Sequence, residues 1–590
     1  MIAIDKVLRD ARTKGKIDAK ELYTGICSKA SYFHYENGER IPDYLTYQAL
    51  IQRLGKSTCD FTYYLSHDEY QYFIWMEKVR HAIKEKQWDE LEKLLAMVYK
   101  PVSLCNEKLR TQYYMYLQAI LMIERNQDYE EASKLVKQAI SVTKPNRRFT
   151  EMEINLFLLE SVLAKKIGNT DEEEQVCRLE ELVSYVKSNV TDEKEQIKLI
   201  VKLIYISVRE YANWIKKEER IHVLEEVLQK LRKRGILYYL PQIMEFYLDE
   251  LEDETEEVTQ LKKQKMAIEE LLKQFGDLGE FSIYELQMTH EFEVLIGEYL
   301  FFHRAEQELT QEEMAEGICE PESYSRIETG KRKPKKKSYE AFADKLGIPC
   351  HYYDVELDTD DYYLLELKQK ISHSSTRGKL KDEQGFIVEL EQKIDLDSVR
   401  NRQYCEMVKN ANAFRQGNIS AEELIARDLK ALAYTIQEEK VGKKSHIYSQ
   451  VEIILINHIA NGYRANNQQE NAAKLLQKLV DDMQVEKFRN RYERMPIYIM
   501  SCQNLGQYYS DMEKYERAIP LFQRNVQLLV QNRDGGGIAK NLAEIALAYE
   551  NIKGTSDIDV EQLFRQTFYI SELFHNEKIH EVILEHCNNL

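Results

Sequence analysis

Apolar residues recur every three or four positions along most of this chain, which is the spacing of one face of an α-helix. Near the middle of the chain, Ile296, Leu300 and Phe301 fall on one such stripe and predict a short helix. Thr310 and Glu313 have the spacing of a capping box, which predicts the start of a second helix. The pattern therefore favours helices throughout, and we expect almost no sheet.

Two further helices follow in the same central stretch. Gly317 suits the left-handed turn that ends a helix abruptly, and Pro321 suits the first position of the next helix. Tyr324 belongs to the apolar side of this third helix, and Phe342 belongs to the apolar side of a fourth. Residues 296–347 are therefore predicted to form a compact unit of four helices.

The chain carries nearly the same stretch twice. Residues 25–42 read GICSKASYFHYENGERIP and residues 317–334 read GICEPESYSRIETGKRKP, and nine of these eighteen positions are identical without a gap. Unrelated segments of this length share about one position by composition. A second four-helix unit is therefore predicted at the N-terminus, 292 residues upstream of the central one.

Paired-helix periodicity follows each of these units. The clearest pair reads Leu505-Gly506-x-x-Tyr509-x8-Ala518-x3-Phe522, in which small residues let two antiparallel helices approach and large ones fill the gap to the next pair. This pair resembles a tetratricopeptide repeat, and looser copies begin near residues 123, 459 and 545. Such pairs cannot bury their apolar faces singly. We expect them to stack into two α-solenoids, so the predicted fold class is all-α.

Composition narrows the functional classes. The 590 residues include only 22 Gly and 9 Pro, and the nine cysteines form no C-x-x-C pair, so we expect reduced thiols rather than disulfides or a zinc knuckle. No run of eighteen apolar residues occurs, so we expect a cytoplasmic protein with no membrane partner. The net charge of −18 argues against nucleic-acid binding by the whole surface, although a local basic patch remains compatible with it.

The central unit resembles the Xre type of helix-turn-helix, the lambda-repressor-like family, through QEEMAEGI at residues 311–318 and RIETGKRKP at residues 326–334. The N-terminal unit shows the same resemblance more weakly, because Ala19 replaces Gln311 and His34 replaces Arg326. The resemblance divides the chain into two helix-turn-helix domains, each followed by a helical repeat region. The four expected domains are residues 1–60, 61–292, 293–352 and 353–590.

In this family the third helix of the unit lies in the major groove, and its outward side chains read base edges. The resemblance therefore implies DNA contacts by two sets of residues. They are Glu320, Glu322, Ser325 and Arg326 in the central unit, and Ser28, Lys29, Phe33, His34 and Arg40 in the N-terminal unit. Arg326 can donate two hydrogen bonds to one guanine, and Gln311 can bind a phosphate.

A basic run follows the reading helix of the central unit, where the DNA backbone would pass. It consists of Lys331, Arg332, Lys333, Lys335, Lys336 and Lys337. Against this, a charge run is more often a solvated face, and residues 293–352 carry a net charge of −3 while residues 1–60 carry +2. Helix-turn-helix folds also serve as docking or dimerisation units, so that reading stays open.

A helix-turn-helix followed by tetratricopeptide-like repeats is similar to the peptide-responsive regulators of Gram-positive bacteria, the Rgg/PlcR/PrgX/NprR (RRNPP) type. The resemblance implies a cytoplasmic transcription regulator that binds double-stranded DNA as a dimer and responds to a short quorum-sensing peptide. Side-chain amides on the first helices of their pairs are the candidate peptide contacts. They are Asn457, Asn461, Gln503, Asn504 and Gln507.

Both halves lie on one chain, so we expect a tandem duplication that acts as a monomeric pseudo-dimer on an asymmetric operator, with a homodimer as the alternative. A second function stays open, in which the repeats bind a partner protein and the helix-turn-helix units only brace them. We expect no enzyme, no cofactor and no metal site. The chain has no G-x-x-x-x-G-K loop, and His580 and His586 are six residues apart where a zinc helix needs four.

Overall fold

The structure is a computed structural model, and it is built almost entirely from helices, which confirms the all-α expectation. It describes residues 4–57, 62–97, 106–168, 171–252, 255–276, 281–286, 293–348, 353–354, 356–359, 361–376, 378–436, 439, 441–442, 448–484, 496–554 and 558–587.

Two units of four short helices have the same element order. Unit 1 consists of α1 (Ile4–Lys14), α2 (Ala19–Tyr23), α3 (Lys29–Glu36) and α4 (Tyr44–Arg53). Unit 2 consists of α15 (Ile296–Glu306), α16 (Gln311–Ala315), α17 (Pro321–Glu328) and α18 (Lys336–Leu346).

The helix boundaries of unit 2 follow from local chemistry. Thr310 and Glu313 form the predicted capping box, and Pro321 occupies the first turn of α17. Gly317 has φ +75°, the left-handed conformation that ends one helix and starts the next. The predicted stripe of α15 needs one correction. Phe301 is 40% exposed, whereas its neighbour Phe302 is buried.

Paired helices follow unit 1 as repeat region 1. They are α5 (His67–Lys84), α6 (Trp88–Ala96), α7 (Glu107–Leu121) with the π-turn Met122–Asn126, α8 (Tyr129–Thr143), α9 (Glu151–Ile167), α10 (Glu172–Asn189), α11 (Glu193–Tyr211) with the 3-10 turn Ala212–Trp214, α12 (Lys217–Arg234), α13 (Leu240–Glu250) and α14 (Glu256–Gln274).

Repeat region 2 follows unit 2 in the same way. It contains α19 (Tyr362–Thr376), α20 (Leu380–Lys393), α21 (Val399–Arg415), α22 (Ala421–Leu432), α23 (Gln450–Ala465), α24 (Gln469–Met483), α26 (Pro496–Asp511), α27 (Tyr515–Gln531), α28 (Ile538–Lys553), α29 (Ile558–Leu573) and α30 (Glu577–Cys587). The predicted pair at Gly506 is α26 and α27, and a Cβ on Gly506 would lie 2.7 Å from the Phe522 ring, so only glycine allows this close approach.

Three short strands join the two halves beneath the four-helix units. β1 (Thr62–Leu65) lies between β2 (Glu293–Leu295), to which it runs parallel, and β3 (Tyr353–Asp354), to which it runs antiparallel. In the antiparallel pair Thr62 is opposite Asp354, and these two positions are also 292 residues apart. Equivalent residues of the two halves therefore meet directly.

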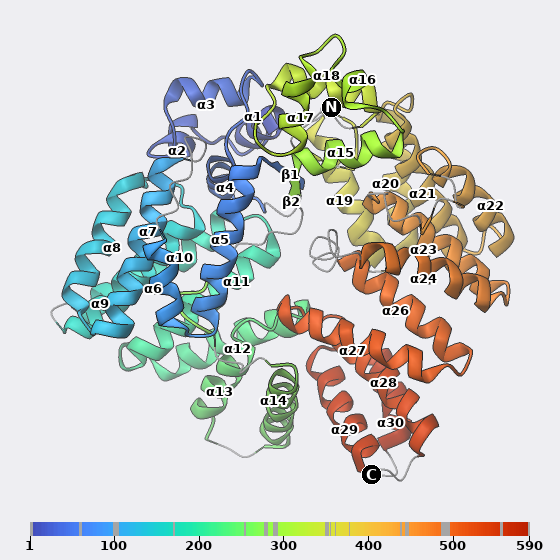
Figure 1. The fold of residues 1–590 in the computed structure, drawn as a ribbon. Coiled ribbons are helices and arrows are strands. Elements are labelled where there is room, and N and C mark those ends of the chain that lie inside the picture. Colours follow the sequence, from blue (N-terminus) through green and yellow to red (C-terminus); the bar gives the residue numbers. More distant parts are fainter. Residues whose placement is uncertain are drawn as a thin grey trace.

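The far ends of the repeat regions meet as well, so the elements form a closed ring with units 1 and 2 at one end (Figure 1). An antiparallel bridge joins Ile236, in the loop before α13, to Asp534, in the loop before α28. Leu237 N donates to Arg533 O at 3.0 Å beside it. Helices α14 and α29 pack together, and Gln264 Nε2 donates to Glu572 Oε2 at 2.8 Å.

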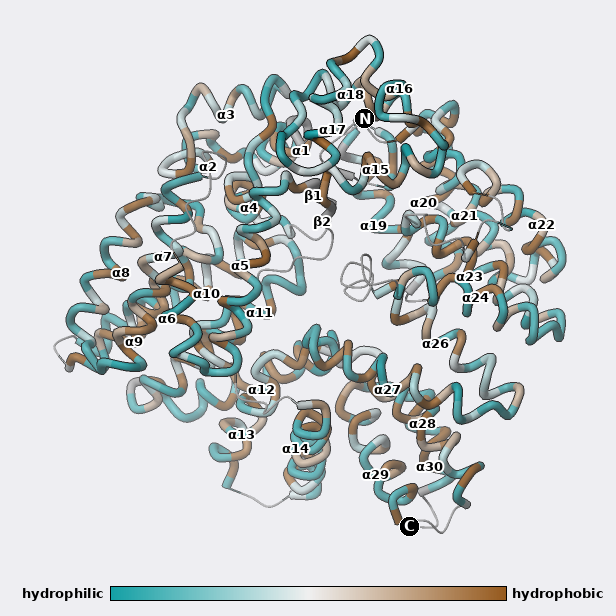
Figure 2. Tube along the Cα trace, in the orientation of Figure 1, coloured by the Kyte–Doolittle hydropathy of each residue, from teal (hydrophilic) through white to brown (hydrophobic). Residues whose placement is uncertain are grey.

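Figure 2 shows hydrophobic and hydrophilic residues interspersed along the helices of both halves. The buried apolar residues form one large cluster that runs through both halves, and a smaller cluster lies near the C-terminus. A shared core of this kind stabilises the closed arrangement of the two halves.

Candidate nucleic-acid interface

The third helix of unit 2, α17, turns its predicted reading face to solvent. Glu320, Glu322 and Arg326 are exposed, and Ser325 is half-buried. The opposite side of the helix is held by Tyr324 and other buried residues, so the helix is fixed while its outer side stays accessible. The face that the sequence assigned to base reading is therefore open in this structure.

Gln311, predicted to hold a phosphate, instead points into its own unit. Its Nε2 donates to Glu328 Oε2 at 2.6 Å. Glu328 is nearly buried and also accepts from Arg304 Nε at 2.6 Å. This hydrogen bond to Glu328 raises the pKa of Arg304. Gln311 therefore adds a hydrogen bond to the ion pair of Arg304 and Glu328 inside unit 2. To contact DNA, it would have to break its hydrogen bond to Glu328.

The basic run after α17 is divided between solvent and unit 1. Lys331, Arg332, Lys335 and Lys337 are exposed. Lys333 Nζ lies 3.0 Å from Glu69 Oε2, at the start of α5. Part of the run therefore holds the two halves together, and DNA contact by these residues stays a prediction.

Two further contacts strengthen this junction. Lys336 Nζ donates to the Gly38 carbonyl oxygen, in the turn after α3. A Cβ on Gly330 would lie 2.8 Å from His67 Cβ, so the turn after α17 rests closely on the first residue of α5.

The reading helix of unit 1, α3, is less clearly shaped for DNA. Ser28 Oγ caps it by accepting from Ser31 N at 3.0 Å, and Lys29 and Arg40 are exposed. His34 Nδ1 lies 2.5 Å from Glu39 Oε2. Phe33, predicted to face outward, is half-buried against the core. Only part of the predicted reading face is therefore available on unit 1.

An identical internal ion pair occurs in both units. Arg12 Nε lies 2.6 Å from Glu36 Oε1, and Arg304 Nε lies 2.6 Å from Glu328 Oε1. Each pair is 292 residues from its counterpart. Each arginine also donates to the carbonyl of the residue before the second helix, Ile17 or Leu309. Sequence reasoning missed this pair, although the matching Arg and Glu at one offset would have revealed it.

A family model described as helix-turn-helix matches residues 303–353. This stretch is a helix-turn-helix domain. The match covers most of unit 2. None of the curated proteins matches the sequence.

Several solved structures resemble the chain at low identity. PlcR of Bacillus thuringiensis, solved with the peptide PapR7 and DNA, is 17% identical with a TM-score of 0.34, covering 49% of this chain and 98% of that one. ComR from S. thermophilus, solved with DNA and its signalling peptide ComS, is 13% identical with a TM-score of 0.30, covering 50% and 99%. The SHP pheromone receptor Rgg2 of Streptococcus dysgalactiae is 14% identical with a TM-score of 0.27, covering 50% and 99%.

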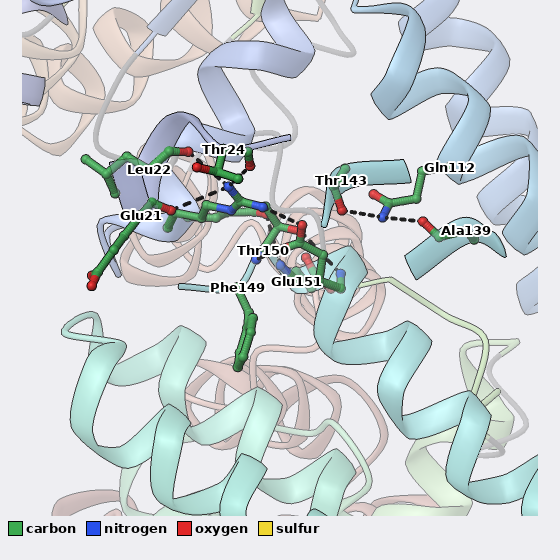
Figure 3. Close-up of polar contacts among 12 residues, drawn as sticks. Glu21, Leu22, Thr24, Gln112, Ala139, Thr143, Phe149, Thr150 and Glu151 are labelled. Carbon is green, nitrogen blue, oxygen red and sulfur yellow. Dashed lines mark hydrogen bonds and ion pairs between the residues drawn. The ribbon is translucent and has the colours of Figure 1, made fainter. Parts of the chain in front are cut away.

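Unit 1, unlike the helix-turn-helix domain of unit 2, is clamped onto its repeats by Arg53. This residue is 1% exposed, and its Nη2 lies 2.6 Å from Oε1 of Glu153, which is fully buried in the capping box of α9. Its Nη1 also donates to the carbonyls of Leu22 at 3.0 Å and Thr24 at 2.6 Å. Figure 3 shows Leu22 and Thr24 close to Thr150 and Glu151. Arg53 therefore closes the end of α2 and anchors unit 1 at once.

Two glycines of unit 1 complete the clamp. A Cβ on Gly25 would lie 1.5 Å from Thr143 O at the end of α8, and a Cβ on Gly55 would lie 1.9 Å from Asn189 O at the end of α10. At the corresponding turns of the helix-turn-helix domain, Gly317 and Gly347, no atom of the described residues lies within 4 Å of such a Cβ. The same surface is thus covered in unit 1 and uncovered in unit 2.

The predicted peptide contacts in repeat region 2 mostly bond to one another. Asn457 is 1% exposed, so it does not line an open surface, and its amide donates to Ser501 Oγ at 2.8 Å and accepts from Asn504 at 2.9 Å. Asn461 accepts from Tyr508 Oη at 2.7 Å. These amides therefore connect α23 with α26.

The two remaining candidates behave differently. Gln507 Nε2 donates to Glu544 Oε1 at 2.9 Å, so it connects α26 with α28. Gln503 Nε2 is buried and has no hydrogen-bond partner among the described residues. The buried amide nitrogen of Gln503 is therefore not engaged by another described residue.

Within the described ranges, no three His, Cys, Asp or Glu side chains are grouped so that they would hold a metal ion. Among the helices that the structure describes, none combines the length and apolar character needed to cross a bilayer.

Proposed function

We propose that this protein is a DNA-binding transcription regulator whose helical repeats bind a peptide or protein ligand. The observation that carries the proposal is the exposed outer face of α17, within the stretch that matches the helix-turn-helix model. Arg326 on this face suits a bidentate contact with guanine. The exposed Lys331, Arg332, Lys335 and Lys337 follow it and suit the adjacent phosphates.

We further propose that the chain acts as a single-chain pseudo-dimer that arose by tandem duplication. The Thr62 and Asp354 pairing and the Ile236 and Asp534 bridge support this, because each joins corresponding elements of the two halves. Self-matching contacts of this kind are the property of an interface between two copies related by a two-fold axis. Because α3 and α17 carry different outer residues, the operator is expected to be asymmetric.

A salt titration of DNA binding tests the first proposal. Sites are first mapped across the host genome, and affinity for one bound site is then measured by fluorescence anisotropy at several salt concentrations. Replacing both Lys335 and Lys337 by Ala should lower the slope of log affinity against log salt by about 2, because each phosphate contact contributes about 0.9.

The matched control is Lys333→Ala, which removes a lysine already paired with Glu69. This variant should change the slope by less than either exposed lysine does. Unchanged affinity and slope in the Lys335 and Lys337 variant would contradict phosphate binding by this run.

Light scattering tests the pseudo-dimer, which should give one chain of 69.9 kDa both free and on its operator. Two chains on a perfect palindrome would overturn it.

The rival function is a protein-binding regulator in which the four-helix units brace the repeats. The clamp at Arg53 favours it for unit 1, because that unit is fixed to repeat region 1 by a buried ion pair. In that case the Lys335 and Lys337 variant would retain its protein partner, and the protein would show no salt-dependent preference among DNA sequences.

A further inference from the structure

Residues 281–286, which precede unit 2, lie inside repeat region 1. We call them the inner segment. Phe281, Ser282, Tyr284 and Leu286 are each less than a tenth exposed. Segments that connect domains normally run over the surface, where water satisfies their backbone groups. The burial of this segment therefore requires that the repeats themselves satisfy its backbone.

Side chains from the first helices of three pairs bind the main chain of the inner segment. Tyr116 Oη, from α7, donates to Tyr284 O at 2.9 Å. Lys202 Nζ, from α11, donates to Glu285 O at 2.8 Å. Tyr239 Oη, from the residue before α13, donates to Ser282 O at 3.1 Å. Donors aimed at backbone carbonyls bind a peptide without regard to most of its side chains, which is how grooves hold short peptides.

Aromatic residues of the repeats hold the two rings of the inner segment. The Phe281 ring lies 5.2 Å from that of Tyr238 and 5.1 Å from that of Tyr239. The Tyr284 ring lies 6.2 Å from that of Trp88 in an edge-to-face arrangement. Two ring anchors beside a row of bound carbonyls give this site a preference for an aromatic residue at each end of a four-residue stretch.

We propose that the inner segment is a built-in peptide ligand of repeat region 1. A free peptide with aromatic residues at the same spacing binds this groove only by displacing it. Because the segment is tethered at both ends, its effective concentration is on the order of millimolar, so it outcompetes a dilute peptide. The inference deepens the proposed peptide binding, and it does not depend on DNA binding.

The inner segment also contacts two junctions, one between the two repeat regions and one between unit 1 and repeat region 1. The guanidinium of Arg533, from repeat region 2, lies 4.4 Å above the Phe281 ring. At the other end, Leu286 lines a small cavity, partly open to solvent, whose wall includes Leu45 and Gln48 of α4. Displacing the segment would therefore weaken two contacts at once. One is the contact between the two halves, and the other is the contact that holds unit 1 on repeat region 1.

Peptide capture by the full-length chain tests the proposal. The probe is fluorescein-labelled FSIYEL with an amidated C-terminus, and a scrambled peptide of the same composition is the control. In the variant with Phe281→Ser and Tyr284→Ser, the inner segment loses both anchors. This variant should bind the probe at least tenfold more tightly than the wild type, and it should bind the scrambled peptide no better than the wild type does.

Three outcomes would overturn the proposal. The wild type and the variant bind the probe equally, or the variant binds probe and scrambled peptide equally, or a folded variant with native circular dichroism binds neither. Adding Tyr116→Phe and Tyr239→Phe to the variant removes two carbonyl donors and should reduce probe affinity again.

Limited proteolysis decides the question if the doubly substituted variant does not fold. Tyr116→Phe and Tyr239→Phe in the otherwise native chain should increase chymotrypsin cleavage after Phe281 and Tyr284 several-fold. Tyr434→Phe is the matched control, because its hydroxyl bonds Glu406 at 2.9 Å in repeat region 2. Cleavage rates that match the control would show that the two hydroxyls do not hold the segment.

Discussion

Arg53 and Lys345 stand at the same position in units 1 and 2, but among the described residues only Arg53 contacts a carboxylate from the repeats. Lys345 Nζ donates to the carbonyls of Glu313 and Glu316 at 2.5 and 2.8 Å, and Arg53 Nη1 contacts the corresponding carbonyls of Glu21 and Thr24. The additional bond of Arg53 to Glu153 fixes unit 1 on its repeats. Unit 1 therefore differs from unit 2 in two respects at this position. It has arginine in place of lysine, and the arginine is paired with Glu153 of the repeats.

Replacing Arg53 by Met should lower the free energy of unfolding by about 3–5 kcal/mol, because Glu153 would stay buried without its partner. Lys345→Met is the matched control, since Lys345 is exposed and bonds backbone carbonyls, with no buried carboxylate beside it in the described part of the chain. It should cost clearly less. Denaturant unfolding followed by tryptophan fluorescence measures both, and equal losses in the two variants would contradict the clamp.

The glycines of the two turns give a second test. Ala at Gly317 should cost roughly 1–2 kcal/mol, because only the left-handed backbone is strained and the space beside it is open. Ala at Gly25 adds a collision with Thr143 O, which should detach unit 1 from the end of α8. Hydrogen exchange at α2 and α8 should therefore increase in Gly25→Ala. The clamp would be refuted if both variants showed the same exchange pattern.

Cys27 and Cys319, which occupy the same turn of units 1 and 2, should differ in reactivity. Burial, helped by the nearby Asp43 carboxylate, raises the pKa of Cys27 to about 12. Burial also raises the pKa of Cys319, which is less enclosed. A raised thiol pKa leaves less of the reactive thiolate at a given pH, so Cys27 should alkylate about tenfold more slowly than Cys319 at pH 8.

Iodoacetamide labelling with peptide mapping by mass spectrometry measures the two rates. Both should rise with pH, because both thiols are mostly protonated at pH 8. In Gly25→Ala, which keeps the Arg53 charge that lowers the pKa of Cys27, the rate of Cys27 should approach that of Cys319. An unchanged Cys27 rate in that variant would mean that unit 1 stays on the end of α8 despite the added carbon.

The closure between the halves can be opened at Gly235. A Cβ there would lie 2.7 Å from Gly536 N, across the junction of the repeat regions. Gly235→Ala should separate these ends and increase the radius of gyration measured by small-angle X-ray scattering. Gly276→Ala is the control, because Gly276 also has a positive φ but no described residue lies within 4 Å of the added carbon. If both variants keep the wild-type radius, the bridge of Ile236 to Asp534 does not hold the ring closed.

Local features were predicted well because they depend on neighbouring residues. The capping box at Thr310, the turn at Gly317 and the start of α17 at Pro321 all follow from contacts within four positions, and the structure confirms them. The helix pair at Gly506 was also found, since its small residue meets Phe522 of the next helix along the chain. Such short-range rules hold whatever the rest of the molecule does.

Site residues were harder to place, because their exposure depends on distant partners. The amide of Asn457 has the composition of a ligand contact, yet α26 buries it. Lys333 belongs to a run that suits phosphates, yet it faces Glu69, 264 residues earlier in the chain. The local sequence pattern cannot distinguish a lysine that is available to bind DNA from one that already forms an ion pair with a carboxylate.

Local sequence patterns were enough to predict the helices, their caps and turns, and two four-helix units of similar sequence. The three-dimensional structure was needed to show that unit 1 is clamped at Glu153, that unit 2 contacts Gly38 and Glu69, and that residues 281–286 are bound by side chains of repeat region 1. The physical reason is separation along the chain. Helix formation is decided within one or two turns, whereas burial of a charge or a carbonyl is decided by whichever distant residue is packed against it.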